Sequence, residues 1–316
     1  MENTDVIQNK PPVKKTFTRL REIKKHKILL IMLIPGLLYY LLFHYKSMYG
    51  LVIAFKDYRI LDGIMASPWA GTKWFEMVFS SAEFWRAFKN TLILSFYKLV
   101  FNFPAPIILA LMLNEVRNTK FKKTVQTMTY LPHFLSWVVL AGIVSNFLSP
   151  SVGPINMIIR ALGGEPVFFL GTKSTFRPVL VISGIWKEVG WNTIIYLAAL
   201  TSVDNQLYEA AALDGAGRIR QTISITLPSI VNVIVIMLIL QMGKIINDDF
   251  DQIYNLYNSN VYSVADVIST YVYRMGLENA MYSFSTAIGL FKNVISFILV
   301  LVTNSVTKRI GDYGLW

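Results

Sequence analysis

Six apolar stretches, each close to the length that crosses a bilayer as a helix, constrain this chain more than any other feature. A helix rises about 1.5 Å per residue, so roughly 20 apolar residues cross a hydrocarbon core of about 30 Å. Only 16% of the residues are charged, against about 25% in typical soluble domains, which is too few to cover the surface of a soluble protein of this size. The sequence therefore predicts an all-α integral membrane protein with six transmembrane helices, at about 28–54, 91–113, 125–148, 179–203, 230–250 and 283–306.

The first stretch has two interpretations, because a basic start followed by an apolar run is also typical of a signal peptide. No small-residue cleavage site follows, and the next residues, "HYKSMYG", are bulky. We therefore expect an uncleaved helix, which ends early or kinks near Pro35. Pro104 and Pro106 likewise predict a kink in the second stretch.

Lysine and arginine residues are distributed unevenly between alternate connections, and this predicts the orientation. They cluster before the first stretch, after the second, between the fourth and fifth, and at the C-terminus. Such clusters favour the cytoplasmic side. Both termini are therefore predicted to be cytoplasmic. The expected organisation is a basic N-terminal segment (1–27), the first helix with its extracytoplasmic connection (28–90), a transmembrane core (91–308) that includes a cytoplasmic loop (204–228), and a C-terminal tail (309–316).

The formal net charge of +11 also needs an explanation in terms of partners. A basic cytoplasmic face accounts for it, and no basic helix with interleaved aromatic residues indicates nucleic-acid binding. We expect the N-terminal run "KKTFTRLREIKKHK" to touch anionic membrane lipid instead.

Two outward connections are long enough to contain structure. The first, at about 55–90, suggests an amphipathic interfacial helix over Glu83–Lys89, and the second contains "INMIIRALGG", a short helix with a glycine stop. Packing at the membrane surface and contact with an extracytoplasmic partner both remain open for these connections.

Several kinds of chemistry lack their sequence signatures. The chain has no cysteine, no GxxxxGK[ST] phosphate loop, and no HExxH or GxSxG motif. Its histidines, His26, His44 and His133, are too scattered to predict a metal site. We therefore expect a protein that is not an enzyme and that itself binds no cofactor and no metal.

Polar residues inside the later stretches point to a solute pathway. Charges at bilayer depth are costly and usually face a cavity or each other. One interpretation is structural, with Lys187 paired to Glu188 or a neighbour and the other lysines, Lys98 among them, snorkelling or ion-paired. The other is a path for a sugar, whose hydroxyl groups need donors, acceptors and aromatic faces, and lysines would suit a carboxylated sugar. The candidate pathway residues are Lys187, Trp191, Asn192, Gln241, Lys244, Asn247, Asp248, Lys292 and Asn293.

The stretch "EAAALDGAGRIRQTISITLP", Glu209 to Pro228, interrupts the apolar pattern between the fourth and fifth helices. Its alanines favour a helix, and Gly215 or Gly217 permits a left-handed turn. A second helix would place Ile219 and Ile223 on one face, and Pro228 would open the fifth span. The expected product is a cytoplasmic helix–turn–helix suited to docking in a groove.

The spacing of this stretch resembles the EAA loop of the membrane subunits of binding-protein-dependent ABC importers. The matching positions are Glu209, Ala210, Ala211, Gly215, Ile225, Leu227 and Pro228, with Asp214 in the turn. Further segments, "YLPHFLSWVV", "NTLILS" and "DYGLW" among them, make the chain similar to the sugar-permease group, and within it to the polysaccharide or aldouronate type called LplB.

That resemblance implies a type I ABC importer permease fold, MetI-like, in a bacterial inner or plasma membrane. It implies a heterodimer with a second permease, two copies of a cytoplasmic ATPase that use ATP and Mg, and an extracytoplasmic solute-binding protein that delivers oligosaccharides. The EAA residues would then couple the pathway to ATP hydrolysis. Two alternatives remain: an ion-coupled secondary transporter of a polar solute, which would need midplane carboxylates, and a scaffold that only assembles other proteins.

Overall fold

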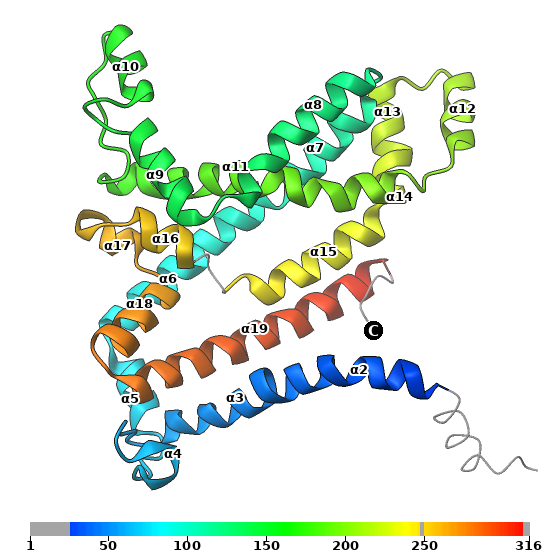
Figure 1. Ribbon diagram of the computed structural model, residues 1–316. Helices are drawn as coiled ribbons and strands as arrows, with labels where there is room; N and C mark the ends of the chain where they lie inside the picture. The colour runs from blue at the N-terminus through cyan, green and yellow to red at the C-terminus, as the bar shows by residue number, and fades with distance from the viewer. Residues whose placement is uncertain (1–25, 247–249, 312–316) are drawn as a thin grey trace, which may run out of the picture. The chain divides into compact units, whose positions relative to one another are not determined.

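The computed structural model describes residues 26–246 and 250–311, drawn as ribbons in Figure 1. The chain divides into an N-terminal unit that ends at Val52 and a larger unit that begins at Ile53. Helices make up both, and in the described ranges the only β-type pairing is a single bridge between Lys56 and Trp69.

The N-terminal unit is one apolar helical run, Lys27–Phe55, of 29 residues. It comprises α2 (Lys27–Tyr39), a π-helical stretch η1 (Tyr40–Tyr45), α3 (Lys46–Met48) and a 3₁₀ stretch η2 (Tyr49–Phe55) whose last residues belong to the larger unit. The expected early end is wrong, because Pro35 lies inside α2 and the helical run continues to Phe55. A proline removes one helical hydrogen bond, but lipid has no polar groups that could compete for the remaining backbone hydrogen bonds.

The second predicted span lies in a helical run of 34 residues, Ala82–Glu115. Its parts are α6 (Ala82–Tyr97), the π-helical η3 (Lys98–Asn102) and α7 (Pro104–Glu115). Glu83–Lys89 are helical as predicted, but they form the first turns of α6 and not a helix of their own. Ser81 starts that helix as its N-cap, its hydroxyl accepting from the Phe84 backbone N–H. Before it, the connection contains α4 (Gly63–Ala66) and α5 (Lys73–Ser80).

Where the sequence predicts a kink at the two prolines of this run, the structure shows a widened helical turn. The Phe103 N–H bonds to the Lys98 carbonyl at 3.1 Å, five residues back instead of four. This π-helical turn comes directly before Pro104, where proline rings would otherwise clash with carbonyls of the preceding turn.

The third predicted span, 125–148, is broken rather than continuous. The helices α8 (Thr119–Tyr130) and η4 (Leu131–Phe134) precede α9 (Trp137–Phe147), and the two parts meet at an angle of 108°. Leu135 and Ser136 are extended, and the Ser136 hydroxyl caps α9 by accepting from Val139 N–H. Beyond α9, α10 (Pro154–Ala161) forms the predicted short helix, and Gly163 ends it with a φ of +82°.

The fourth predicted span is α11 (Lys173–Leu200), whose 28 residues give a length of about 42 Å. Three described helices are both long and apolar enough to cross a membrane: Lys27–Phe55, Ala82–Glu115 and Tyr282–Arg309. The helix α11 is not among them, because Lys187 and Glu188 in its middle lower its mean hydropathy. Each bent pair adds one further candidate span, for up to five among the described residues.

The fifth span is shorter than predicted. The helix α15 covers only Val231–Lys244, and it meets the preceding helical run, Arg218–Ser229, at 61°. Pro228 therefore does not open the fifth span, because the bend falls at Ile230, two residues later. The chain continues through α16 (Phe250–Leu256), η6 (Ser259–Val261), α17 (Tyr262–Ala265), α18 (Ile268–Tyr273) and η7 (Arg274–Glu278) to α19 (Tyr282–Gly311).

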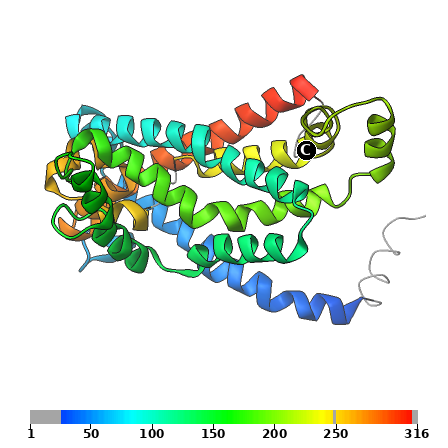
Figure 2. The same ribbon diagram turned by 90° about the horizontal axis from the view of Figure 1, so that it is seen from above.

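The helix α11 lies among other helices of the larger unit, as Figures 1 and 2 show. The helices α7 and α8 contact α11, and α15 lies against α19. One buried apolar cluster joins α9, α11 and α16, a second joins α6, α18 and α19, and a third joins α7 with α11 at Ile107 and Tyr196. Burial of these apolar faces against one another positions the polar residues described below.

A buried ion pair stabilises the segment between α16 and α19. Asp266 is fully buried and accepts from both terminal nitrogens of Arg274, at 2.6 and 3.1 Å. These hydrogen bonds raise the pKa of Arg274 above its ordinary value. Asn90 of α6 donates to the Asp266 backbone carbonyl, so the pair is tied to the second span.

Candidate permeation cavity and coupling loop

The segment between α11 and α15 forms the predicted helix–turn–helix. The helix α12 (Asn205–Leu213) begins at Asp204, whose carboxylate accepts from Gln206 N–H, and α13 (Arg218–Gln221) continues through η5 (Thr222–Thr226) into α14 (Leu227–Ser229). Between α12 and α13, Gly215 has a φ of +77°. The Ala216 N–H bonds to Ala211 O and the Gly215 N–H to Ala212 O, the hydrogen bonds of a Schellman turn.

The two glycines of this turn have different roles. Gly215 adopts the left-handed conformation that disfavours a side chain, whereas Gly217 is the N-cap of α13 with a φ of −70°. The left-handed requirement is therefore at Gly215, the glycine of the EAA pattern.

The coupling loop, residues 204–228, exposes most of its predicted docking residues. Glu209, Ala210, Asp214, Gly215, Leu227 and Pro228 are exposed, whereas Ala211 and Ile225 are half-buried. Leu213 is 91% exposed and Ile219 is 78% exposed, which is unusual for apolar side chains in a polar loop. Exposed apolar side chains of this kind are suited to docking against another protein.

One contact joins the two halves of the coupling loop, and a second attaches the loop to the rest of the unit. The hydroxyl groups of Tyr208 and Thr226 lie 3.0 Å apart and join α12 to η5. Arg218 lies 3.9 Å from Glu115 at the end of α7, with both side chains largely exposed. The second contact is weak, because exposed ion pairs contribute about 0–1 kcal/mol.

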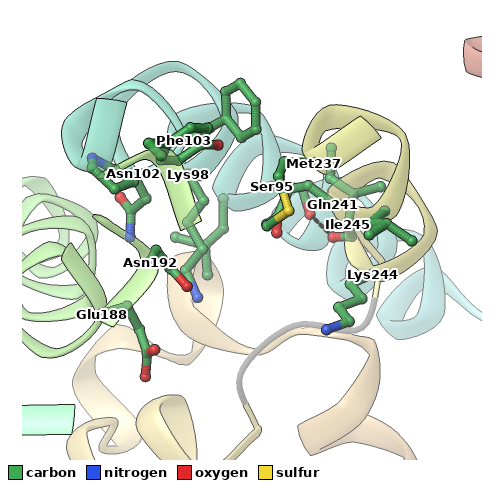
Figure 3. A pocket seen from close by; sticks show the side chains of 14 residues that line it. Ser95, Lys98, Asn102, Phe103, Glu188, Asn192, Met237, Gln241, Lys244 and Ile245 are labelled. Atoms are coloured by element: carbon green, nitrogen blue, oxygen red, sulfur yellow. Dashed lines mark hydrogen bonds between the residues drawn. The ribbon is translucent and has the colours of Figure 1, made fainter. Parts of the chain in front are cut away.

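A cavity of about 340 Å³ lies among α6, η3, α7, α11 and α15 (Figure 3). It brings together three of the predicted pathway residues, Asn192, Gln241 and Lys244. The sequence had also indicated charge at bilayer depth at Lys98 and Glu188, which line the same cavity. The remaining lining residues are Leu94, Ser95, Asn102, Phe103, Pro106, Tyr196, Met237, Leu240 and Ile245.

Lys98 reaches this cavity from the π-helical turn and is held there by a buried amide. Its ammonium donates to Gln252 Oε1 at 3.1 Å, and Gln252 is fully buried. The Gln252 amide in turn donates to Leu180 O and Ser183 Oγ of α11, at 2.7 and 2.9 Å. The sequence analysis missed Asn102; its position one helical turn after Lys98 in an apolar span is the signal that could have identified it.

Four of the other predicted pathway residues lie elsewhere. Lys187 and Trp191 face the bend of the third span, and Lys292 and Asn293 belong to α19 and do not line the cavity. Asn247 and Asp248 fall outside the described residues.

Lys187 stabilises the bend between η4 and α9. Its buried ammonium donates to the carbonyls of His133 and Leu135, at 2.9 and 2.6 Å, and lies 5.6 Å from the centre of the Trp137 ring. Glu188, the neighbour that the sequence suggested as its partner, instead accepts from His133 Nδ1 at 2.9 Å. A cation at the end of a helix also interacts favourably with the helix dipole.

We expect Lys187→Met to destabilise the protein by about 2 kcal/mol, because two charge-assisted hydrogen bonds to buried carbonyls are lost and the relief of the buried ammonium offsets only part of that loss. The measurement is the midpoint of thermal unfolding in detergent. Lys292→Met, which removes a lysine from α19, is the control and should change the midpoint less. Equal midpoints for the two variants would contradict this role for Lys187.

Three comparisons place this geometry among known proteins. The family model for the binding-protein-dependent transport system inner membrane component matches residues 102–312. Protein LplB of Bacillus subtilis (strain 168) is 47% identical over 93% of this chain and 92% of its own length. The polygalacturonan/rhamnogalacturonan transport system permease protein YteP of the same organism is 46% identical over 94% of this chain and 92% of its own.

Solved structures agree with the sequence relatives. A chain from the crystal structure of a bacterial ABC transporter involved in the import of the acidic polysaccharide alginate superposes with a TM-score of 0.86. It is 44% identical and covers 93% of this chain and 99% of its own. A second structure contains the alginate transporter in complex with an alginate pentasaccharide-bound periplasmic protein, with the same TM-score.

These similarities confirm the predicted all-α, MetI-like ABC permease fold. They favour an ABC transport component over both an enzyme and an ion-coupled secondary transporter. The chain belongs to the family of binding-protein-dependent transport system inner membrane components.

Proposed function

We propose that this permease conducts acidic oligosaccharides through the cavity between α6, α11 and α15. The observation that carries the proposal is the composition of that cavity, which combines the amides of Asn102, Asn192 and Gln241 with the ammonium groups of Lys98 and Lys244. Amides match the hydroxyl groups of a sugar, and ammonium groups match a carboxylate. The similarity to the polygalacturonan/rhamnogalacturonan permease YteP supports a saccharide substrate, and the similarity to the alginate transporter supports an acidic one.

The proposed assembly follows the family. An extracytoplasmic solute-binding protein would deliver the saccharide, a second permease would complete the pathway as a heterodimer, and two cytoplasmic ATPase copies would use ATP and Mg. The chain would lie in the bacterial inner or plasma membrane, with lipid around it, both termini in the cytoplasm and no nucleic-acid partner. The exposed Leu213 and Ile219 on the coupling loop support docking of that loop on an ATPase.

The uronate part of the proposal is tested by charge neutralisation. We expect Lys244→Gln to reduce uptake of an oligouronide about tenfold and uptake of a neutral oligosaccharide of equal length much less, because a charge-assisted contact contributes about 1.5–3 kcal/mol. The measurement is uptake into proteoliposomes that contain the complete transporter and its binding protein.

Lys292→Gln is the matched control, because it removes the same charge from α19 without altering the cavity lining. It should affect both saccharides equally and only slightly. Equal losses of charged and neutral substrate in Lys244→Gln would show that the cavity does not recognise the carboxylate.

A further inference from the structure

Glu188 is the acidic residue among the lining residues of a cavity that also has two lysines. It projects from α11, whereas Lys244 projects from α15 on a separate wall (Figure 3). Its side chain is 38% exposed, so its carboxylate is accessible from the cavity. No ion pair joins it to Lys98 or Lys244 among the residues that the structure describes.

His133 fixes the orientation of this carboxylate. Its Nδ1 lies 2.9 Å from Glu188 Oε2, and because the ionised carboxylate can only accept, the proton is assigned to Nδ1. In the described ranges, His133 provides the one hydrogen bond to Glu188 from the protein. A carboxylate has about four acceptor sites, so acceptor capacity remains on the cavity side.

His133 is itself held at two points, its ring and its backbone. Its ring stacks on the indole of Trp191, with ring centres 4.5 Å apart and an angle of 2° between the planes. Its backbone carbonyl accepts from the ammonium of Lys187 at 2.9 Å. Lys187, Glu188 and Trp191 thus all contact His133. Together these contacts fix the direction of its Nδ1–H bond.

We propose that Glu188 is a specificity-determining residue that accepts hydrogen bonds from hydroxyl groups of a sugar ring in the cavity, and that His133 is its positioning residue. A polar site that is built for hydroxyl groups discriminates against analogues that lack them, because its buried acceptors are then left unpaired. This inference rests on the proposed saccharide pathway and deepens it. The sugar hydroxyls face α11, and a sugar carboxylate faces the lysines of η3 and α15.

The test compares uptake of an oligosaccharide with uptake of its O-methylated counterpart, which can accept but not donate hydrogen bonds at the methylated positions. The complete transporter is used in proteoliposomes, with the binding protein, so that the preference of the binding protein is the same for every permease variant. The wild-type preference for the hydroxylated sugar should fall about tenfold in Glu188→Ala. The amount of assembled transporter should be unchanged.

Two substitutions at His133 separate positioning from packing. His133→Phe keeps an aromatic ring against Trp191 but removes the donor, so the hydroxyl preference should fall. His133→Asn places an amide donor near the position of Nδ1, so the preference should be largely restored. A purely structural role for His133 predicts the reverse order, because asparagine loses the ring stack.

An unchanged hydroxyl preference in Glu188→Ala would overturn the proposal. If Glu188→Ala does not assemble, Glu188→Met serves instead, because it keeps roughly the length of the side chain and has no oxygen acceptor; an unchanged preference in that variant would be equally decisive. Failure of the uronate proposal is a separate result. A transporter that imports only neutral oligosaccharides would contradict the role of Lys244 and would leave the hydroxyl preference measurable.

Discussion

Gly215→Val is expected to reduce coupled uptake at least tenfold, whereas Gly217→Val should reduce it by less than about twofold. A Cβ at either position meets open space within 4 Å, so crowding does not distinguish the two. Their backbones do, because Gly215 has a φ of +77° and Gly217 a φ of −70°. A non-glycine residue in the left-handed region costs about 1–2 kcal/mol, and more for a β-branched side chain.

The expected defect lies in coupling because Gly215 sets the direction in which the chain leaves α12. Valine would weaken the Schellman hydrogen bonds from Ala216 and Gly215 and change how α12 presents its exposed face. The measurement is saccharide uptake together with ATPase activity stimulated by the loaded binding protein. Equal behaviour of the two valine variants, or normal uptake in Gly215→Val, would contradict a role for this turn in docking.

The coupling loop could be predicted from the sequence because its structure is local. An alanine-rich helix, a glycine turn and a second helix are each specified by residues a few positions apart. The choice between Gly215 and Gly217 needed the structure. The position of Pro228 was misjudged because tertiary packing of Ile230, which is buried against α7 and α11, sets the bend after α14.

The cavity could be predicted only in part. Helical spacing places Glu188, Asn192 and Tyr196 on one face of α11, and Lys187 and Trp191 on an adjacent face. Periodicity cannot say which face meets the cavity and which meets the bend of the third span. That decision depends on η4, which lies more than fifty residues earlier in the chain, and on the extended residues Leu135 and Ser136 that turn the helix by 108°.

The broken third span was missed for the same physical reason. The sequence "YLPHFLSWVV" is apolar enough to cross a membrane, and hydropathy does not register a change of direction. The carbonyls released at the bend must find donors in an environment without water, and the buried ammonium of Lys187 supplies them. A charge that the sequence assigned to the pathway is therefore explained by the backbone that it satisfies.

Gly190→Ala is expected to have the largest effect on stability. A Cβ at Gly190 would lie 2.2 Å from the carbonyl oxygen of Thr129 and 2.8 Å from the backbone nitrogen of Tyr130. Both are main-chain atoms of α8, so no side-chain rotation relieves the clash and the two helices must separate. Overpacking of this kind costs about 3 kcal/mol or more, and we expect little assembled transporter in membranes, with an unfolding midpoint lower by about 5 °C or more in what remains.

Gly142→Ala is the matched control, since Gly142 also lies inside an apolar helix, α9, but a Cβ there meets nothing within 4 Å. It should leave the unfolding midpoint unchanged or raise it, because alanine is favoured over glycine inside a helix by about 0.5–1 kcal/mol. A normal yield and midpoint for Gly190→Ala would mean that α8 and α11 are not in backbone contact. The bend held by Lys187, and the orientation of Glu188 by His133, depend on that contact, so both would have to be abandoned with it.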